Sequence, residues 1–133
     1  KDEPIWKVIK MIRMTQSAED YLEAVHVLIA SGRPAQVRDV ANMLSVKMPS
    51  VVKAVSELKK LGLVTQEPYC PIELTEKGRR VARLVNDRHN LLKRFLEKLG
   101  VSPKIADKDA CLMEHILSAE TLDKIRIYTE ERK

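Results

Sequence analysis

The sequence predicts a mainly α-helical protein, with an N-terminal winged helix-turn-helix followed by an all-helical lobe. Amphipathic segments at helical spacing fill most of the 133 residues, and the four glycines and six prolines fall near their ends. Two short segments are joined by a tight turn near residue 45, as in a helix-turn-helix. The stretch after Gly62, "LVTQEPYCPIELT", then reads as a short hairpin with a proline-containing tip before helical periodicity returns.

The N-terminal part contains two amphipathic segments. Apolar residues at helical spacing predict a helical extension over residues 1–13. A second helix over 15–32 has Thr15 and Ser17 as possible N-caps, because hydroxyl side chains accept hydrogen bonds from the first free N–H groups of a helix. Gly32 is the expected end of this helix.

The helix-turn-helix itself lies between residues 36 and 62. Its first helix covers 36–44, and its second follows Ser45, with Pro49 in the first turn and Gly62 as the stop. The positions that we expect to face inward share helical spacing and apolar character: Val37, Val40, Ala41, Leu44, Val46, Val51, Val55 and Leu58.

After the hairpin the chain is helical again. Thr75 together with Gly78 opens a long helix that Gly100 closes, and shorter helices follow over 102–117 and 118–133. Ser118 is the expected N-cap of the last helix, whose inward residues are Leu122, Ile125 and Tyr128. We therefore divide the chain into an extension (1–13), a winged helix-turn-helix domain (14–78) and a helical domain (79–133).

Charge is distributed unevenly between the two halves. Net charge is +5, but residues 47–60 carry four lysines against one glutamate, whereas residues 107–123 carry five acids against one lysine. This asymmetry suggests two functions in two lobes. No apolar run approaches the roughly 18 residues that a membrane span needs, and no secretory signal is visible. We expect a cytoplasmic protein whose two cysteines, Cys70 and Cys111, are reduced.

The second helix of the helix-turn-helix has the surface of a DNA-reading helix. Short polar and cationic side chains remain outside once the apolar positions are turned inward, and lysines farther along can neutralise phosphates. The expected DNA-binding residues are Lys47, Pro49, Ser50, Lys53, Lys59 and Lys60. The alternative is a helical hairpin with a solvated basic face, which would not explain the hairpin and the "LTEKG" step that follow.

The stretch "DACLMEHILS" places three donors within five residues. In a helix, Cys111, Glu114 and His115 occupy positions i, i+3 and i+4 and share one face. Taken alone, the stretch is also compatible with a core cysteine beside a solvated Glu–His pair. Further donors lie elsewhere: Asp20 and Glu23 are three apart on one helix, and His89 lies in the long helix. Such a set suits first-row divalent ions, with the thiolate favouring the softer ones.

The order "SAEDYLEAVHVL", winged helix, "RHNLLKRFLEKLGV" and "DACLMEHILS" resembles the diphtheria-toxin-repressor family of metal-dependent transcriptional regulators, from about Met14 to near the C-terminus. The resemblance implies a homodimeric winged-helix repressor that dimerises through its helical lobe. It also implies Mn(II) or Fe(II) as co-repressor, with Zn(II) and Co(II) possible in vitro, operator DNA as partner, and metal-uptake genes as targets.

The resemblance also implies a ligand set, carried over position by position. The residues that match ligand positions of the manganese-sensing branch are Asp20, Glu23, His89, Glu114 and His115. Cys111 departs from that branch, which has Glu there, and matches the iron-sensing branch. The iron branch has Met at the position of Asp20, and its second site needs a carboxylate where this chain has Lys93. The expected site is therefore a hybrid of the two branches.

Two other functions remain open at this point. A winged-helix regulator could sense an oxidant or a small molecule through Cys111 or Cys70. A divalent-metal hydrolase could use Asp20, Glu114 and His115, but it would leave the basic reading helix unexplained. We expect a regulator that is not an enzyme, with no membrane contact and no small-molecule substrate.

Overall fold

The computed structural model describes residues 15–131, which form two compact units. The first unit ends at Arg83 and the second begins at Leu84. The predicted extension over 1–13 lies outside the described residues. Within residues 15–131, no helix combines the length and the apolar character that a membrane crossing requires.

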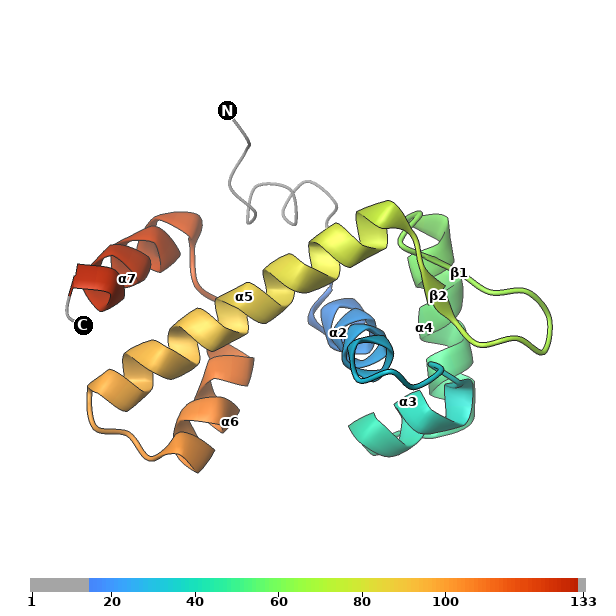
Figure 1. The fold of residues 1–133 in the computed structure, drawn as a ribbon, viewed down its shortest axis with the longest axis horizontal. Helices are drawn as coiled ribbons and strands as arrows, with labels where there is room; N and C mark the ends of the chain where they lie inside the picture. Colours follow the sequence, from blue (N-terminus) through green and yellow to red (C-terminus); the bar gives the residue numbers. More distant parts are fainter. Residues whose placement is uncertain (1–14, 132–133) are drawn as a thin grey trace. The chain divides into compact units, whose positions relative to one another are not determined.

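The described part of the first unit, residues 15–83, contains three helices, a hairpin and the beginning of α5 (Glu76–Lys98) (Figure 1). The helices are α2 (Gln16–Ala30), α3 (Val37–Leu44) and α4 (Met48–Lys60), and all three pack against one another. The Thr15 hydroxyl oxygen caps α2 by accepting a hydrogen bond from the Ala18 N–H at 3.0 Å. Of the two predicted N-caps, Thr15 is confirmed, whereas Ser17 lies inside the helix.

The turn between α3 and α4 is set by Ser45, which adopts a left-handed conformation with φ 56° and ψ 45°. The Ser45 backbone ends α3, and Lys47 rather than Ser45 is the N-cap of α4. Pro49 lies in the first turn of α4, as predicted. Val46, which we expected to face inward, is 37% exposed because it lies in the turn outside both helices.

The predicted hairpin is present and short. Strands β1 (Val64–Thr65) and β2 (Glu73–Leu74) pair antiparallel, with Val64 opposite Leu74. Ile72 forms a further bridge to Ala35, which ties the hairpin to the segment before α3. The winged helix-turn-helix expectation is therefore confirmed.

Helix α5 (Glu76–Lys98) begins at the signal that the sequence predicts. The Thr75 hydroxyl accepts a hydrogen bond from the Gly78 N–H at 2.9 Å. Glycine is required at position 78, since a Cβ there would collide with the Leu63 carbonyl oxygen. The start of α5 thus lies directly against the residue that precedes β1.

The second unit contains the later part of α5, then α6 (Pro103–Met113) and α7 (Ala119–Glu131). Its core is small: Leu92, Ala110 and Leu122 are buried together, with three half-buried apolar side chains around them. The Ser118 hydroxyl caps α7 by accepting from the Thr121 N–H at 3.2 Å.

Two expectations for this unit are wrong. The helix predicted over 102–117 ends at Met113, because backbone bonding changes from four-residue to three-residue spacing after the Glu114 N–H bonds to Ala110. Tyr128 is 41% exposed, with its ring edge-on to Phe95 at 6.1 Å, and the next residue, Thr129, is buried instead.

Candidate metal centre

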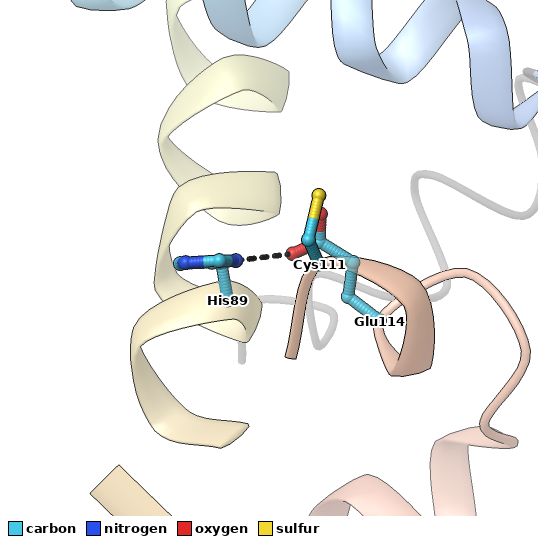
Figure 2. A group of neighbouring side chains, drawn as sticks. All are labelled: His89, Cys111 and Glu114. Carbon is cyan, nitrogen blue, oxygen red and sulfur yellow. Dashed lines mark ion pairs between the residues drawn. The ribbon is translucent and has the colours of Figure 1, made fainter. Parts of the chain in front are cut away.

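Three donors of different chemistry meet inside the second unit. His89 comes from α5, Cys111 from the last turn of α6, and Glu114 from the residue that ends α6 (Figure 2). One imidazole nitrogen, the thiol sulfur and one carboxylate oxygen lie within 4.8 Å of one another. Nitrogen, sulfur and oxygen donors at this spacing can share one divalent transition-metal ion.

Glu114 is the most buried member of this group, with 1% of its surface exposed. Its Oε2 lies 3.6 Å from His89 Nδ1, and its Oε1 lies 3.4 Å from His115 Nε2. Within residues 15–131, no group donates a hydrogen bond to either oxygen. A carboxylate held inside a protein without hydrogen bonds is unfavourable unless a cation compensates it. The donor set and the carboxylate environment therefore fit a bound metal ion.

His115 lies beside Glu114, but it lies in the turn after α6 and not on the helix, where the sequence predicted it. Glu114 ends α6 with a helical backbone conformation and lies beside Cys111, whereas His115 lies in the turn that follows. The His115 side chain is only 3% exposed and lies beside Glu114, on the carboxylate oxygen that does not face His89. Glu114 and His115 are therefore neighbours, as predicted, although α6 ends at Met113.

Asp20 and Glu23 are half-buried residues of α2, in the first unit. Their spacing of three places both on one side of that helix, as expected. Both take part in interactions with other groups. Their role as metal ligands remains a prediction.

Sequence reasoning missed one residue beside the donors. Asp107 Oδ1 lies 2.8 Å from His89 Nε2, which is a hydrogen-bond distance. The only sequence signal is its position four residues before Cys111, which places both on one face of α6. An acidic residue on a half-exposed helix is too common for that spacing alone to single it out.

The predicted DNA-binding residues are all exposed. Helix α4 buries Val51, Val55 and Leu58, which leaves its opposite surface to solvent. The exposed positions on that surface and at the helix ends include Lys47, Pro49, Ser50, Lys53, Lys59 and Lys60. Both cysteines are free thiols, Cys70 being exposed on the hairpin and Cys111 half-buried in the donor group.

A winged helix-turn-helix joined to a lobe with clustered metal donors defines a class: DNA-binding regulators controlled by a metal ion. Two family models place the chain within this class. The "Iron dependent repressor, N-terminal DNA binding domain" matches residues 13–71, and the "Iron dependent repressor, metal binding and dimerisation domain" matches residues 75–133. The chain belongs to this family of iron-dependent repressors, the diphtheria-toxin-repressor family.

Individual relatives agree with this assignment. An uncharacterized HTH-type transcriptional regulator of Methanocaldococcus jannaschii is 41% identical over 122 residues, which cover 90% of this chain and 98% of the relative. The transcriptional regulator MntR of Escherichia coli O6:H1 is 39% identical, covering 85% and 73%. The solved manganese regulator SloR matches with a TM-score of 0.77 and 26% identity, over 90% of this chain and 56% of that one.

The predicted family, fold class and general function are thereby confirmed. The chain is a metal-dependent transcriptional repressor with a divalent manganese or iron cofactor, and its partners are DNA and a second copy of itself.

Proposed function

We propose that this repressor binds operator DNA as a homodimer when a metal ion occupies the donor group, and thereby controls metal-uptake genes. The observation that supports this most directly is the buried Glu114 carboxylate, which accepts no hydrogen bond from residues 15–131 and lies beside imidazole and thiol donors. The proposed ligands are Asp20, Glu23, His89, Cys111, Glu114 and His115.

Ligands from both units would couple metal binding to DNA binding. His89, Cys111, Glu114 and His115 belong to the second unit, whereas Asp20 and Glu23 belong to the unit that contains α4. An ion held by both sets would have different affinities for different arrangements of the units, and only such a difference can shift the population toward the DNA-binding form. Activation and affinity need not rank the metals alike.

The donor chemistry bears on the choice of metal. Carboxylates and imidazoles suit Mn(II) and Fe(II), whereas a thiolate such as that of Cys111 favours softer ions. Several relatives are named as manganese regulators, among them the solved SloR. We propose that both Mn(II) and Fe(II) activate this chain and that Cys111 raises its response to Fe(II).

DNA reading is proposed for the exposed surface of α4. Ser50 and Lys53 lie in its first two turns, where short polar or cationic side chains can reach base edges in a major groove. Lys47 and Pro49 belong to the same groove-facing start of the helix, whereas Lys59 and Lys60 at its far end would contact phosphates. A two-fold symmetric dimer would then read paired half-sites.

Part of the dimer interface is expected in the second unit. Leu112 and Ile116 are 56% and 76% exposed, although both are large and apolar. Leu91 and Phe95 are half-buried and are proposed for the same interface, whereas Leu92 is fully buried in the unit's own core and does not belong to it. Sedimentation of the metal-loaded chain at micromolar concentration should give a dimer, and a monomer would contradict the proposal.

The remaining parts of the proposal concern what the protein does not do and where it acts. We propose that it has no catalytic activity, acts on no small-molecule substrate and works in the cytoplasm. Membership of a transcriptional-regulator family supports this interpretation.

The test is a gel shift of operator DNA with and without a chelator, across Mn(II), Fe(II), Co(II) and Zn(II). We expect binding to require an ion and to be lost in His89→Ala, His115→Ala and Cys111→Ser. A thiol sensor would keep its response after either histidine is removed and lose it only with Cys111. Chelator-insensitive binding would contradict metal control.

A further inference from the structure

Asp107 lies beside the donor group formed by His89, Cys111 and Glu114. It lies on α6, four residues before Cys111 and seven before Glu114, so that these positions follow one side of the helix. The imidazole of His89, on α5, lies between the two acidic ends of this row. His89 Nε2 is 2.8 Å from Asp107 Oδ1, and His89 Nδ1 is 3.6 Å from Glu114 Oε2.

The two distances distinguish the two ring nitrogens. The shorter one is a hydrogen-bond distance, and the longer one is not. A carboxylate accepts hydrogen bonds and does not donate them, so the nitrogen that bonds to Asp107 must carry the hydrogen. In a neutral imidazole the other nitrogen, Nδ1, is then unprotonated and carries the lone pair. That nitrogen is on the side of Glu114, as Figure 2 shows.

We propose that Asp107 is a positioning residue for metal binding: it holds His89 in the tautomer with the hydrogen on Nε2 and directs the Nδ1 lone pair toward Cys111 and Glu114. The inference rests on the proposed function, since it requires that this donor group binds an ion. Asp107 itself is not a ligand. It acts on the ion only through the imidazole.

The expected size of the effect follows from exposure. A carboxylate that holds a ligating histidine typically contributes about 10- to 100-fold to metal affinity. The Asp107 side chain is 60% exposed, whereas that of His89 is 14% exposed. Because water can replace an exposed carboxylate in part, we expect an effect at the lower end, about 10-fold.

The first experiment measures Co(II) affinity of the full chain by titration of its absorption bands, for wild type, Asp107→Ala and Asp107→Asn. Asp109→Asn is the matched control, because it removes the same charge from an exposed position of the same helix. We expect Asp107→Ala to weaken binding about 10-fold, Asp107→Asn to weaken it less, and the control to remain within about twofold of wild type. An equal loss in Asp107→Ala and the control would overturn the proposal.

The second experiment reads the tautomer directly in the metal-free chain. Nitrogen-15 NMR of ring-labelled histidine at a pH of about 8, above the ordinary imidazole pKa of about 6.5, resolves the two tautomers. There are three histidines in the sequence, and His89→Gln assigns the relevant signal. We expect Nε2–H in wild type and a tautomer mixture in Asp107→Ala. An unchanged Nε2–H signal in that variant would overturn the proposal.

These measurements distinguish a failure of the proposed function from a failure of the positioning role of Asp107. If wild type fails to bind Co(II), Mn(II) or Fe(II), the proposed function fails, and with it the role of Asp107 in metal binding. If wild type binds these ions but Asp107→Ala binds them equally well, only the positioning role fails.

Discussion

The two units of the chain differ in how they stabilise buried acidic side chains. In the first unit, buried leucine and valine side chains from α2, α3 and α4 form an extensive apolar core, and the buried Glu19 interacts with another group. In the second unit, a cluster around Leu92 joins α5, α6 and α7, and the carboxylate oxygens of Glu114, which ends α6, accept no hydrogen bond within residues 15–131. We therefore expect the first unit to depend on apolar burial and the second unit to gain stability when a cation compensates Glu114.

The largest expected effect comes from the apolar core of the first unit. Leu22 is fully buried in α2, and Leu22→Ala should lower the free energy of unfolding by about 3–5 kcal/mol, because it leaves a cavity. Urea unfolding of the metal-free chain followed by circular dichroism measures this change. Leu112→Ala, at a 56% exposed position, is the control and should change it by about 0.5 kcal/mol or less. A similar loss of unfolding free energy in both variants would contradict the expected difference between the buried and the exposed position.

The next effect concerns the buried carboxylate. Glu114→Gln should weaken metal binding by about 100-fold or more. Losing a residue that only hydrogen-bonds to a ligand costs about 10- to 100-fold, and losing a ligand itself should cost more. The same variant should leave the melting temperature of the metal-free chain unchanged or raise it, since a buried charge is replaced by a neutral amide. Calorimetry with and without chelator measures both quantities. A large loss of stability in the metal-free variant would show that Glu114 is mainly structural.

Cys111→Glu tests which metal the donor group prefers. Replacing the thiolate by a carboxylate should shift activation toward Mn(II) at the expense of Fe(II) and Co(II), since hard oxygen donors favour Mn(II). Operator binding against a concentration series of each ion measures the ranking. If the ranking does not change, Cys111 is a half-buried core cysteine and not a ligand.

The smallest effect is expected at the exposed end of α4. Lys59→Ala should reduce the dependence of DNA affinity on salt by about one unit of slope, because one phosphate contact is lost. Lys53→Ala should instead cost roughly 1–3 kcal/mol on operator DNA and much less on random DNA. Binding isotherms on both DNAs over a range of salt concentrations separate the two. Equal losses on both DNAs for Lys53→Ala would remove it from the base-reading residues.

Sequence signals predicted the element boundaries wherever a specific residue sets them. Thr15 caps α2, the Thr75–Gly78 pair opens α5, and Ser118 caps α7. The end of α6 at Met113 could not be predicted, because residues 114–117 contain no glycine or proline and retain apolar periodicity. Backbone bonding in the folded unit, and not local composition, ends this helix.

The candidate site was predictable in part. The spacing of Cys111, Glu114 and His115 and the family resemblance identified His89 as a further donor, and the structure brings His89 together with Cys111 and Glu114. The hydrogen bond from His89 to Asp107 could not be predicted, because it depends on how α5 and α6 pack in the second unit.

The contact between Gly78 and the Leu63 carbonyl has an evolutionary consequence. Every other amino acid would place a Cβ where that oxygen lies, so selection acts on position 78 through the fold alone. Metal ligands can diverge when a lineage changes the ion that it senses, and we propose that position 111 is one of them. A comparison of many relatives should therefore find less variation at position 78 than at position 111, even among regulators that respond to different metals.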